Sequence, residues 1–285
     1  MPIDPSKALG AELGAGEASW TQDDVILYHL GVGAGNPPTD ANELEYTYEK
    51  NLKVLPSYGV IPVFSSLGGL GQVEGLEFNF ALLLHGEQDI QIHKPLPTHA
   101  TVVSSGKVAE LWDKGKACLC VLEVETREKE SGDALFTNRF GIFLRGEGGF
   151  GGEKGPEAGN APPEREPDGV IERASLPQQA LLYRLSGDKN PLHADPEFAK
   201  MGGFDKPITH GLCSYGIVCK AVVDEVLGGD VTKVARYQAR FRGVAFPGET
   251  YVVKYWKEGD QIIVEASSKE RGAPIISNCA VTVRD

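Results

Sequence analysis

The sequence predicts an α+β protein built from two similar units, each with helical segments followed by an antiparallel sheet. In the second half, apolar residues recur at helical spacing from Leu212 to Val226, and segments of alternating pattern follow. A segment rich in Gly and Pro, residues 146–174, separates two halves in which similar short motifs occur in the same order. Helices followed by runs of strands are typical of α+β folds.

The first unit, residues 1–145, begins with a helical run around residues 27–30, and a longer helix is expected before its strands. Residues 96–98, Leu-Pro-Thr, precede a strand rich in Thr and Val. Residues 113–117, Asp-Lys-Gly-Lys-Ala, have the composition of a hairpin tip, and residues 135–138 fall in the last strand.

The segment 146–174 has almost no apolar residue to bury, so it is predicted to be a linker. Phe150 is an unusual residue to leave in solvent, and a long functional loop therefore remains an alternative.

The second unit, residues 175–285, repeats the motifs of the first in the same order, at residues 182–185, 246–248, 257–261 and 275–278. Its long helix is expected to end at a Gly-Gly pair. Four strands are expected to follow, over residues 237–242, 250–256, 261–267 and 275–283. The common order indicates duplication of one unit, and pairing the two side by side covers an exposed sheet edge.

The most informative stretch is residues 182–193, where a helical run ends and polar residues of catalytic type follow. Asp188, Asn190 and His193 lie within six positions of one another. Pro191 prevents the helix from continuing and favours an extended Asn190. A carboxylate, an amide and an imidazole on a short stiff loop could hold water for acid–base chemistry.

This stretch, Leu182-Tyr-Arg-Leu-Ser-Gly-Asp-Lys-Asn-Pro-Leu-His193, resembles the signature of the hydratase 2 enzymes, a MaoC-like group. The Gly-Gly-Phe-Gly-Gly stretch of the linker is also similar to that family. The resemblance implies a double hot-dog fold. It also implies reversible, (3R)-specific hydration of trans-2-enoyl-CoA in fatty acid metabolism.

The chemistry needs a base beside the attacking water and an electrophilic pull on the thioester carbonyl. We expect Asp188 and His193 to hold one water and transfer its protons, with either of them in either role. Asn190 is expected to orient the carboxylate or the water. Gly211 precedes the long helix, whose free N–H groups could bind an enolate oxygen; the family motif places an oxyanion-binding amide there. A glycine needed only for helix packing is the alternative.

Substrate contacts follow mainly from the resemblance. It implies that His85 and Gly86 line the thioester, that Lys114 binds CoA and that Phe241 flanks the pantetheine. Arg240 could meet a CoA phosphate, although a solvated surface residue is an equal alternative. No metal is expected, because nothing resembles a compact His-x-x-x-His helix pair. No cofactor is expected, because CoA is part of the substrate.

Residues 31–38 of the first unit correspond to the catalytic loop of the second unit. Residues 31–38 contain an Asn-Pro pair but lack the Asp and the His of that loop. We therefore predict one active site per chain and a non-catalytic first unit that binds substrate. By analogy with double hot-dog hydratases, this unit is expected to widen around a long acyl chain.

A net charge of -12 argues against nucleic acid as a partner. Apolar runs are too short to span a bilayer, and the five cysteines form no Cys-x-x-Cys pair, so a cytoplasmic protein with free thiols is expected. A homodimer of double units is also expected. Three other classes remain open: a metalloenzyme using Asp188, His193 and His210, a hot-dog thioesterase, and a non-catalytic acyl-CoA binding protein.

Overall fold

The computed structural model describes residues 3–284. Its strands are β1 (Glu12–Trp20), β2 (Leu83–Ile92), β3 (Ala100–Asp113), β4 (Ala117–Glu128), β5 (Ala134–Arg145), β6 (Gly169–Ala174), β7 (Val234–Phe241), β8 (Thr250–Glu258), β9 (Gln261–Ser268) and β10 (Pro274–Val283). Its α-helices are α1 (Pro5–Ala8), α2 (Gln22–Gly31), α3 (Ala41–Thr47), α4 (Gln179–Tyr183), α5 (Pro196–Met201) and α6 (Gly211–Val226). Its 3₁₀ helices are η1 (Pro56–Val60), η2 (Phe64–Gln72), η3 (Phe80–Leu82), η4 (Arg184–Ser186), η5 (Pro191–His193) and η6 (Val231–Lys233).

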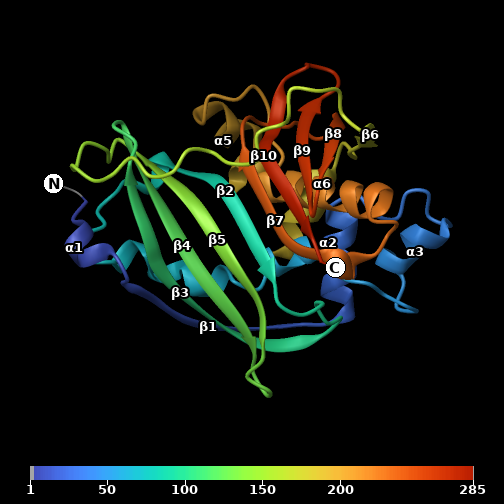
Figure 1. Ribbon diagram of the computed structural model, residues 1–285, viewed down its shortest axis with the longest axis horizontal. Coiled ribbons are helices and arrows are strands. Elements are labelled where there is room, and N and C mark those ends of the chain that lie inside the picture. Colours follow the sequence, from blue (N-terminus) through green and yellow to red (C-terminus); the bar gives the residue numbers. More distant parts are fainter. Residues whose placement is uncertain (1–2, 285) are drawn as a thin grey trace.

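All ten strands form one sheet in the order β1-β3-β4-β5-β2-β7-β10-β9-β8-β6 (Figure 1). The first half contributes β1-β3-β4-β5-β2, and the second half repeats this topology as β6-β8-β9-β10-β7. The α+β class and the duplication predicted from the sequence are therefore confirmed.

The two halves join through antiparallel pairing of β2 with β7, from Glu87 opposite Arg240 to Gln91 opposite Arg236. Each half would otherwise expose the backbone groups of this strand at an edge. The junction therefore makes one continuous sheet from two units, and it brings residues about 150 positions apart into contact.

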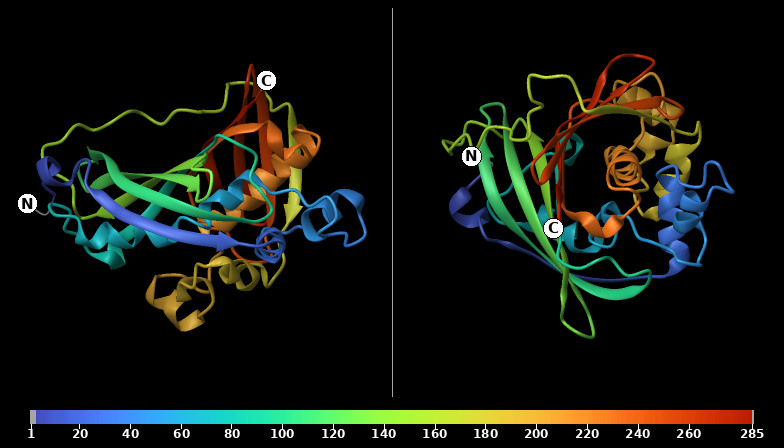
Figure 2. Two further views of the ribbon diagram at one scale, coloured as in Figure 1. Left: turned by 90° about the horizontal axis from the view of Figure 1, so that it is seen from below. Right: turned by 45° about the vertical axis from the view of Figure 1, so that its right-hand side comes forward.

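The sheet curves around α6, which the right-hand view of Figure 2 shows nearly end-on. Every residue from Leu212 to Val223 is buried, so the helix is enclosed on all sides rather than amphipathic. The helix ends before Gly228 and Gly229, both with positive φ, as the Gly-Gly pair predicts. Within residues 3–284, no helix has the length and apolar character needed to cross a membrane.

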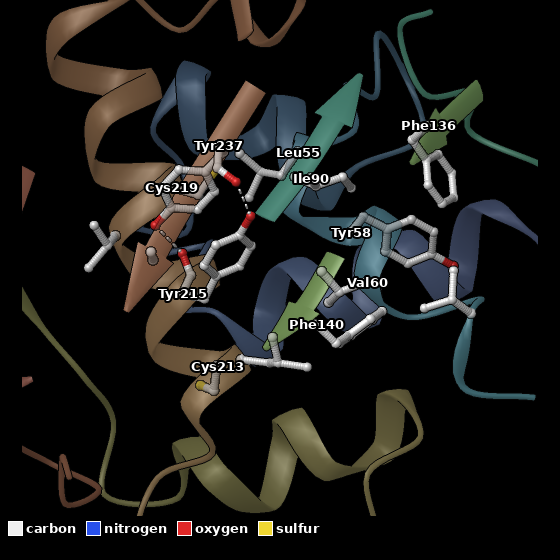
Figure 3. Packing of buried hydrophobic residues seen from close by; sticks show 14 of the residues in the cluster. Leu55, Tyr58, Val60, Ile90, Phe136, Phe140, Cys213, Tyr215, Cys219 and Tyr237 are labelled. Carbon is white, nitrogen blue, oxygen red and sulfur yellow. Dashed lines mark hydrogen bonds between the residues drawn. The ribbon is translucent and has the colours of Figure 1, made fainter. Parts of the chain in front are cut away.

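Two stacked tyrosines fix α6 to the sheet beside the junction (Figure 3). Tyr215 donates its hydroxyl to the carbonyl of Tyr237 at 2.8 Å, and Tyr237 donates its own to the carbonyl of Tyr215 at 3.0 Å. Both rings are fully buried, with centroids 4.0 Å apart. Each buried hydroxyl thus has the partner that burial demands.

The longer helix expected in the first unit is a wrong prediction. Among the described residues of that unit, the longest helix is α2 with 10 residues, and the 3₁₀ helices η1 and η2 occupy the place before the strands. Pro56, Pro62 and Gly69 lie in this stretch, and Pro and Gly are the poorest helix formers. One long helix, α6, therefore serves both halves.

The end of the predicted linker also needs correction. Residues 169–174 of the segment 146–174 form β6, which pairs with β8 at the sheet edge and buries Ile171. The second unit thus begins with a strand equivalent to β1. Charged neighbours on either side hid this short edge strand from the apolar pattern.

Candidate active site

The loop after α4 and η4 holds Asp188 and Asn190 in a fixed turn. Gly187 ends the helical run at φ 135, a backbone region that favours glycine. Asp188 Oδ1 accepts the backbone N–H of Asn190 at 3.0 Å, and Asn190 Oδ1 accepts that of Leu192 at 3.0 Å. The Asn190 side chain thereby caps η5, whose last residue is His193.

His193 is buried, and its ring is held in one orientation. Its Nδ1 lies 2.9 Å from the carbonyl oxygen of Ile208. A carbonyl can only accept, so Nδ1 carries the proton and Nε2 of the neutral ring is a free acceptor. Burial lowers the pKa of His193, against the effect of the Asp188 charge. The ring is therefore neutral, and able to act as a base, near pH 7.

The structure brings Asp188, His193 and His210 together, with one carboxylate or ring-nitrogen atom of each within 4.8 Å of the others. The two imidazoles stack with centroids 3.7 Å apart. His210 Nε2 donates to the carbonyl of Asp188 at 3.3 Å, while its buried Nδ1 has no partner among the described residues. Such a set could hold a cation, and it is equally suited to hold water between a carboxylate and an imidazole.

Gly211 begins α6 immediately after His210 and faces the ring of Phe241. A Cβ on Gly211 would lie 3.3 Å from Phe241 Cδ1, closer than is usual for such a contact. The first N–H groups of this 16-residue helix lack helical acceptors and carry partial positive charge. Gly211 therefore lies where the sequence predicted it, at the N-terminus of the long helix, with little space around its Cα.

His85 and Gly86 reach the same place from the first half, across the junction of β2 and β7. The His85 ring packs edge-on against Phe241, with centroids 5.1 Å apart, and donates from Nε2 to the carbonyl of Glu87 at 3.0 Å. Burial lowers the pKa of His85 to about 4, and the nearby Asp188 charge opposes this shift. A Cβ on Gly86 would overlap the ring of Phe143, so a larger residue would displace the strand here.

Lys114 and Arg240 lie away from this cluster. Lys114 is at the tip of the β3–β4 hairpin, where its Nζ donates to the carbonyl of Lys154. Arg240 pairs with Glu87 and, with it, lines a cavity of about 320 Å³ beneath linker residues 156–160. Successive strand residues face opposite sides, so Phe241 faces the site and Arg240 the outer side. Arg240 therefore lies apart from the acid–base cluster, and its expected contact with a CoA phosphate stays a prediction.

Two further side chains border the site without having been predicted. The ring of Tyr183 lies 4.9 Å from that of His210, and its buried hydroxyl has no partner among the described residues. Phe64, from the first half, is 3.9 Å from the position of a Cβ on Gly187. Tyr183 stands in the motif and could have been singled out, whereas no sequence signal points to Phe64.

A shared acid–base site at the junction of two sheet units that wrap one helix defines a double hot-dog protein of the MaoC type. Comparisons with known proteins agree. Residues 19–146 match the family model "MFE-2 hydratase 2 N-terminal domain", and residues 158–278 match "MaoC like domain".

Curated relatives similar to this chain include named enoyl-CoA hydratases. Enoyl-CoA hydratase ChsH3 of Mycobacterium tuberculosis is 44% identical over 97% of this chain and 97% of its own length. The peroxisomal enoyl-CoA hydratase 2 of Arabidopsis thaliana is 41% identical over 91% of this chain and 89% of its own. The mouse peroxisomal multifunctional enzyme type 2 is 40% identical over 96% of this chain, which spans 38% of that enzyme. The chain belongs to the MaoC-like hydratase 2 family.

Solved structures show the same fold. A MaoC-like dehydratase from Phytophthora capsici superposes with a TM-score of 0.86 at 32% identity, covering 99% of both chains. The full-length peroxisomal multifunctional enzyme type 2 of Drosophila melanogaster gives 0.81 at 33% identity, covering 95% of this chain and 48% of that one. The double hot-dog fold expected from the sequence is thus confirmed.

Proposed function

We propose that this protein catalyses the reversible addition of water to a trans-2-enoyl-CoA, giving a (3R)-3-hydroxyacyl-CoA, in fatty acid metabolism. The observation that carries the proposal is the Asp188 carboxylate within 4.8 Å of a ring nitrogen of the neutral His193, beside a helix N-terminus. Relatives named enoyl-CoA hydratase and 3-hydroxyacyl-thioester dehydratase support it. The (3R) sense rests on the resemblance to the family.

Asp188 and His193 would hold one water between them. The water oxygen attacks C3 of the enoyl group as a proton passes to the free Nε2 of His193. The electrons of the double bond move towards the thioester carbonyl, and a proton returns from the same pair to C2. No atom is gained or lost besides the water, so the CoA of the substrate is the only cofactor we propose.

The negative charge that develops on the thioester oxygen needs a donor already in place. We propose the backbone N–H of Gly211, at the N-terminus of α6, for this role. The contact of Gly211 with Phe241 leaves little room for a side chain between the helix end and the substrate. His85 and Gly86 would line the thioester, and Phe241 the pantetheine arm, with Lys114 further along the CoA.

The acyl chain is proposed to enter the first half. A cavity of about 280 Å³ lies there, lined by Trp20, Tyr58 and Ile61 of the first half and by Leu185 and Ser186, just before the catalytic loop. No helix equivalent to α6 occurs among the described residues of the first unit, which supports the idea that this unit offers space. Ile61→Trp should lower kcat/KM for a ten-carbon enoyl-CoA and spare crotonyl-CoA. An equal effect on both would contradict this path.

The direct test is loss of enoyl-thioester absorbance when the purified protein is mixed with crotonyl-CoA. We expect Asp188→Asn and His193→Gln each to lower kcat by about 10²–10⁴-fold, the usual contribution of a positioned acid or base. His93→Gln is the matched control, because His93 is an exposed histidine in contact with Thr137. Chiral analysis of the product checks the (3R) assignment.

A thiol reagent in the same assay separates the remaining candidates. Release of free CoA without hydration would indicate a thioesterase. Crotonyl-CoA binding without any reaction would indicate an acyl-CoA binding protein. The expected homodimer stays a prediction, which light scattering of the purified protein checks. The expected cytoplasmic location likewise stays a prediction.

A further inference from the structure

The Gly-rich start of the linker is bound to the tip of the β3–β4 hairpin by backbone bonds, such as the Asp113 N–H to the carbonyl of Glu153 at 2.8 Å, and by the buried carboxylate of Asp113. Asp113 Oδ1 accepts the backbone N–H groups of Gly115 at 2.8 Å and Gly149 at 2.9 Å, and its Oδ2 accepts that of Gly151 at 3.0 Å. A Cβ on Gly148 would lie 2.5 Å from the carbonyl oxygen of Gly115, so this close approach requires glycine. Residues 146–155, the docked segment, are therefore held in place on the hairpin.

Four cations gather where the docked segment meets the sheet. Lys114 and Lys116 are on the hairpin, Arg145 is paired with Ala117 across β5 and β4, and Lys154 belongs to the docked segment. None of the four has a carboxylate within 4 Å among the described residues, Glu147 and Glu153 of the same segment included. The net charge of the chain is -12, so four neighbouring cations without a carboxylate partner form a local site that attracts an anion.

The sheet register relates these cations to the active site. His85 lies opposite Ile142 of β5, and Ile142 lies opposite Cys120 of β4. Two strand spacings, together with the three residues from Cys120 to Ala117, put the hairpin tip roughly 14 Å from His85. The pantetheine arm separates the thioester of an acyl-CoA from its nucleotide phosphates by a length of that order.

We propose that the docked segment forms part of the surface that binds the nucleotide phosphates of CoA, and that Asp113 is the positioning residue that holds it there. The proposal rests on the proposed function, because it takes an acyl-CoA as the ligand. Lys154 reaches the phosphates only while its segment stays on the hairpin, beside Lys114. An amide at position 113 keeps one acceptor oxygen but turns an NH₂ group towards a backbone N–H, so it weakens the attachment of the segment and leaves the backbone bonds.

The test compares crotonyl-CoA with crotonyl-pantetheine, which has the same reacting group and no nucleotide phosphates. Asp113→Asn should raise KM for crotonyl-CoA about tenfold, the effect of losing one charge-assisted contact, with kcat within about twofold. KM for crotonyl-pantetheine should not change. Lys154→Ala should shift KM in the same way, without acting on the fold. Asp133→Asn is the control, since Asp133 pairs with Lys94 at the β4–β5 hairpin.

An equal rise in KM for both substrates, or a fall in kcat for both, would mean that Asp113 only stabilises the fold and would overturn the proposal. If Asp113→Asn does not fold, Lys154→Ala decides by the same comparison. If the wild-type protein does not hydrate crotonyl-CoA, the proposed function fails separately, and calorimetry with CoA and pantetheine takes over. Tighter binding of CoA than of pantetheine that is lost in Lys154→Ala supports the proposed phosphate-binding surface. Equal binding of the two ligands by the wild-type protein overturns the proposal.

Discussion

The buried side chain of His29 should lower the free energy of unfolding of the protein as the pH falls. In α2 its Nδ1 lies 2.8 Å from the carbonyl oxygen of Tyr46, and its Nε2 accepts the N–H of Leu55 at 3.2 Å. A second ring proton would face that N–H and lose the bond. Burial lowers the pKa of His29 to about 4, and the charges of Lys220 and Lys53 act in the same direction.

In the unfolded chain a histidine titrates near 6.5, so between pH 6.5 and 4 the unfolded state binds more protons than the folded state. The stability that neutral His29 contributes is present above pH 6.5 and is lost as the pH falls. The difference between 6.5 and about 4 corresponds to about 3 kcal/mol at pH 4.

Urea unfolding of the wild-type protein and of His29→Gln at several pH values measures this contribution. The difference in free energy of unfolding between the wild-type protein and His29→Gln should decrease by about 3 kcal/mol from pH 7 to pH 4. The other buried histidines are present in both proteins, so their effects cancel. His93→Gln, an exposed control, should leave the urea midpoint near that of the wild type. A gap for His29→Gln that does not change with pH would refute the reasoning.

Three further predictions concern the site and its support. Gly211→Ala places a Cβ 3.3 Å from the Phe241 ring and should lower kcat about tenfold or more at an unchanged melting temperature; full activity would exclude a close approach at this glycine. Lys220→Met removes the buried cation between the half-buried carboxylates of Glu43 and Asp224 and should cost about 3 kcal/mol in urea unfolding; a change below 1 kcal/mol would mean that the cluster is well solvated. Treatment with a chelator should leave the hydration rate unchanged, and a loss restored by zinc would favour the metalloenzyme reading.

The catalytic loop could be predicted because its signals are local. A helical run, a glycine, a carboxylate and a proline occur within residues 182–193, and short-range sterics turn such an order into a stiff loop. The long helix α6 and the strands β7 to β10 also follow from periodicity within single segments. The repeated order of motifs indicated duplication before any contact was known.

Other features depended on which surfaces meet. The site places His85 beside Phe241, more than 150 positions along the chain, because β2 pairs with β7. Alternation along β7 could show that Arg240 and Phe241 face opposite sides, but it could not show which side would carry the site.

The sequence by itself determined the helix α6, the strands β7 to β10, the repeat and the catalytic loop, since each is encoded in neighbouring residues. Only the tertiary structure stacked His210 on His193, gave the two halves a single central helix and docked the linker on Asp113. Contacts of this kind form where side chains distant in the chain compete for the same buried space. Which of these side chains come into contact is determined by the packing of the whole molecule, not by the pattern of any one segment.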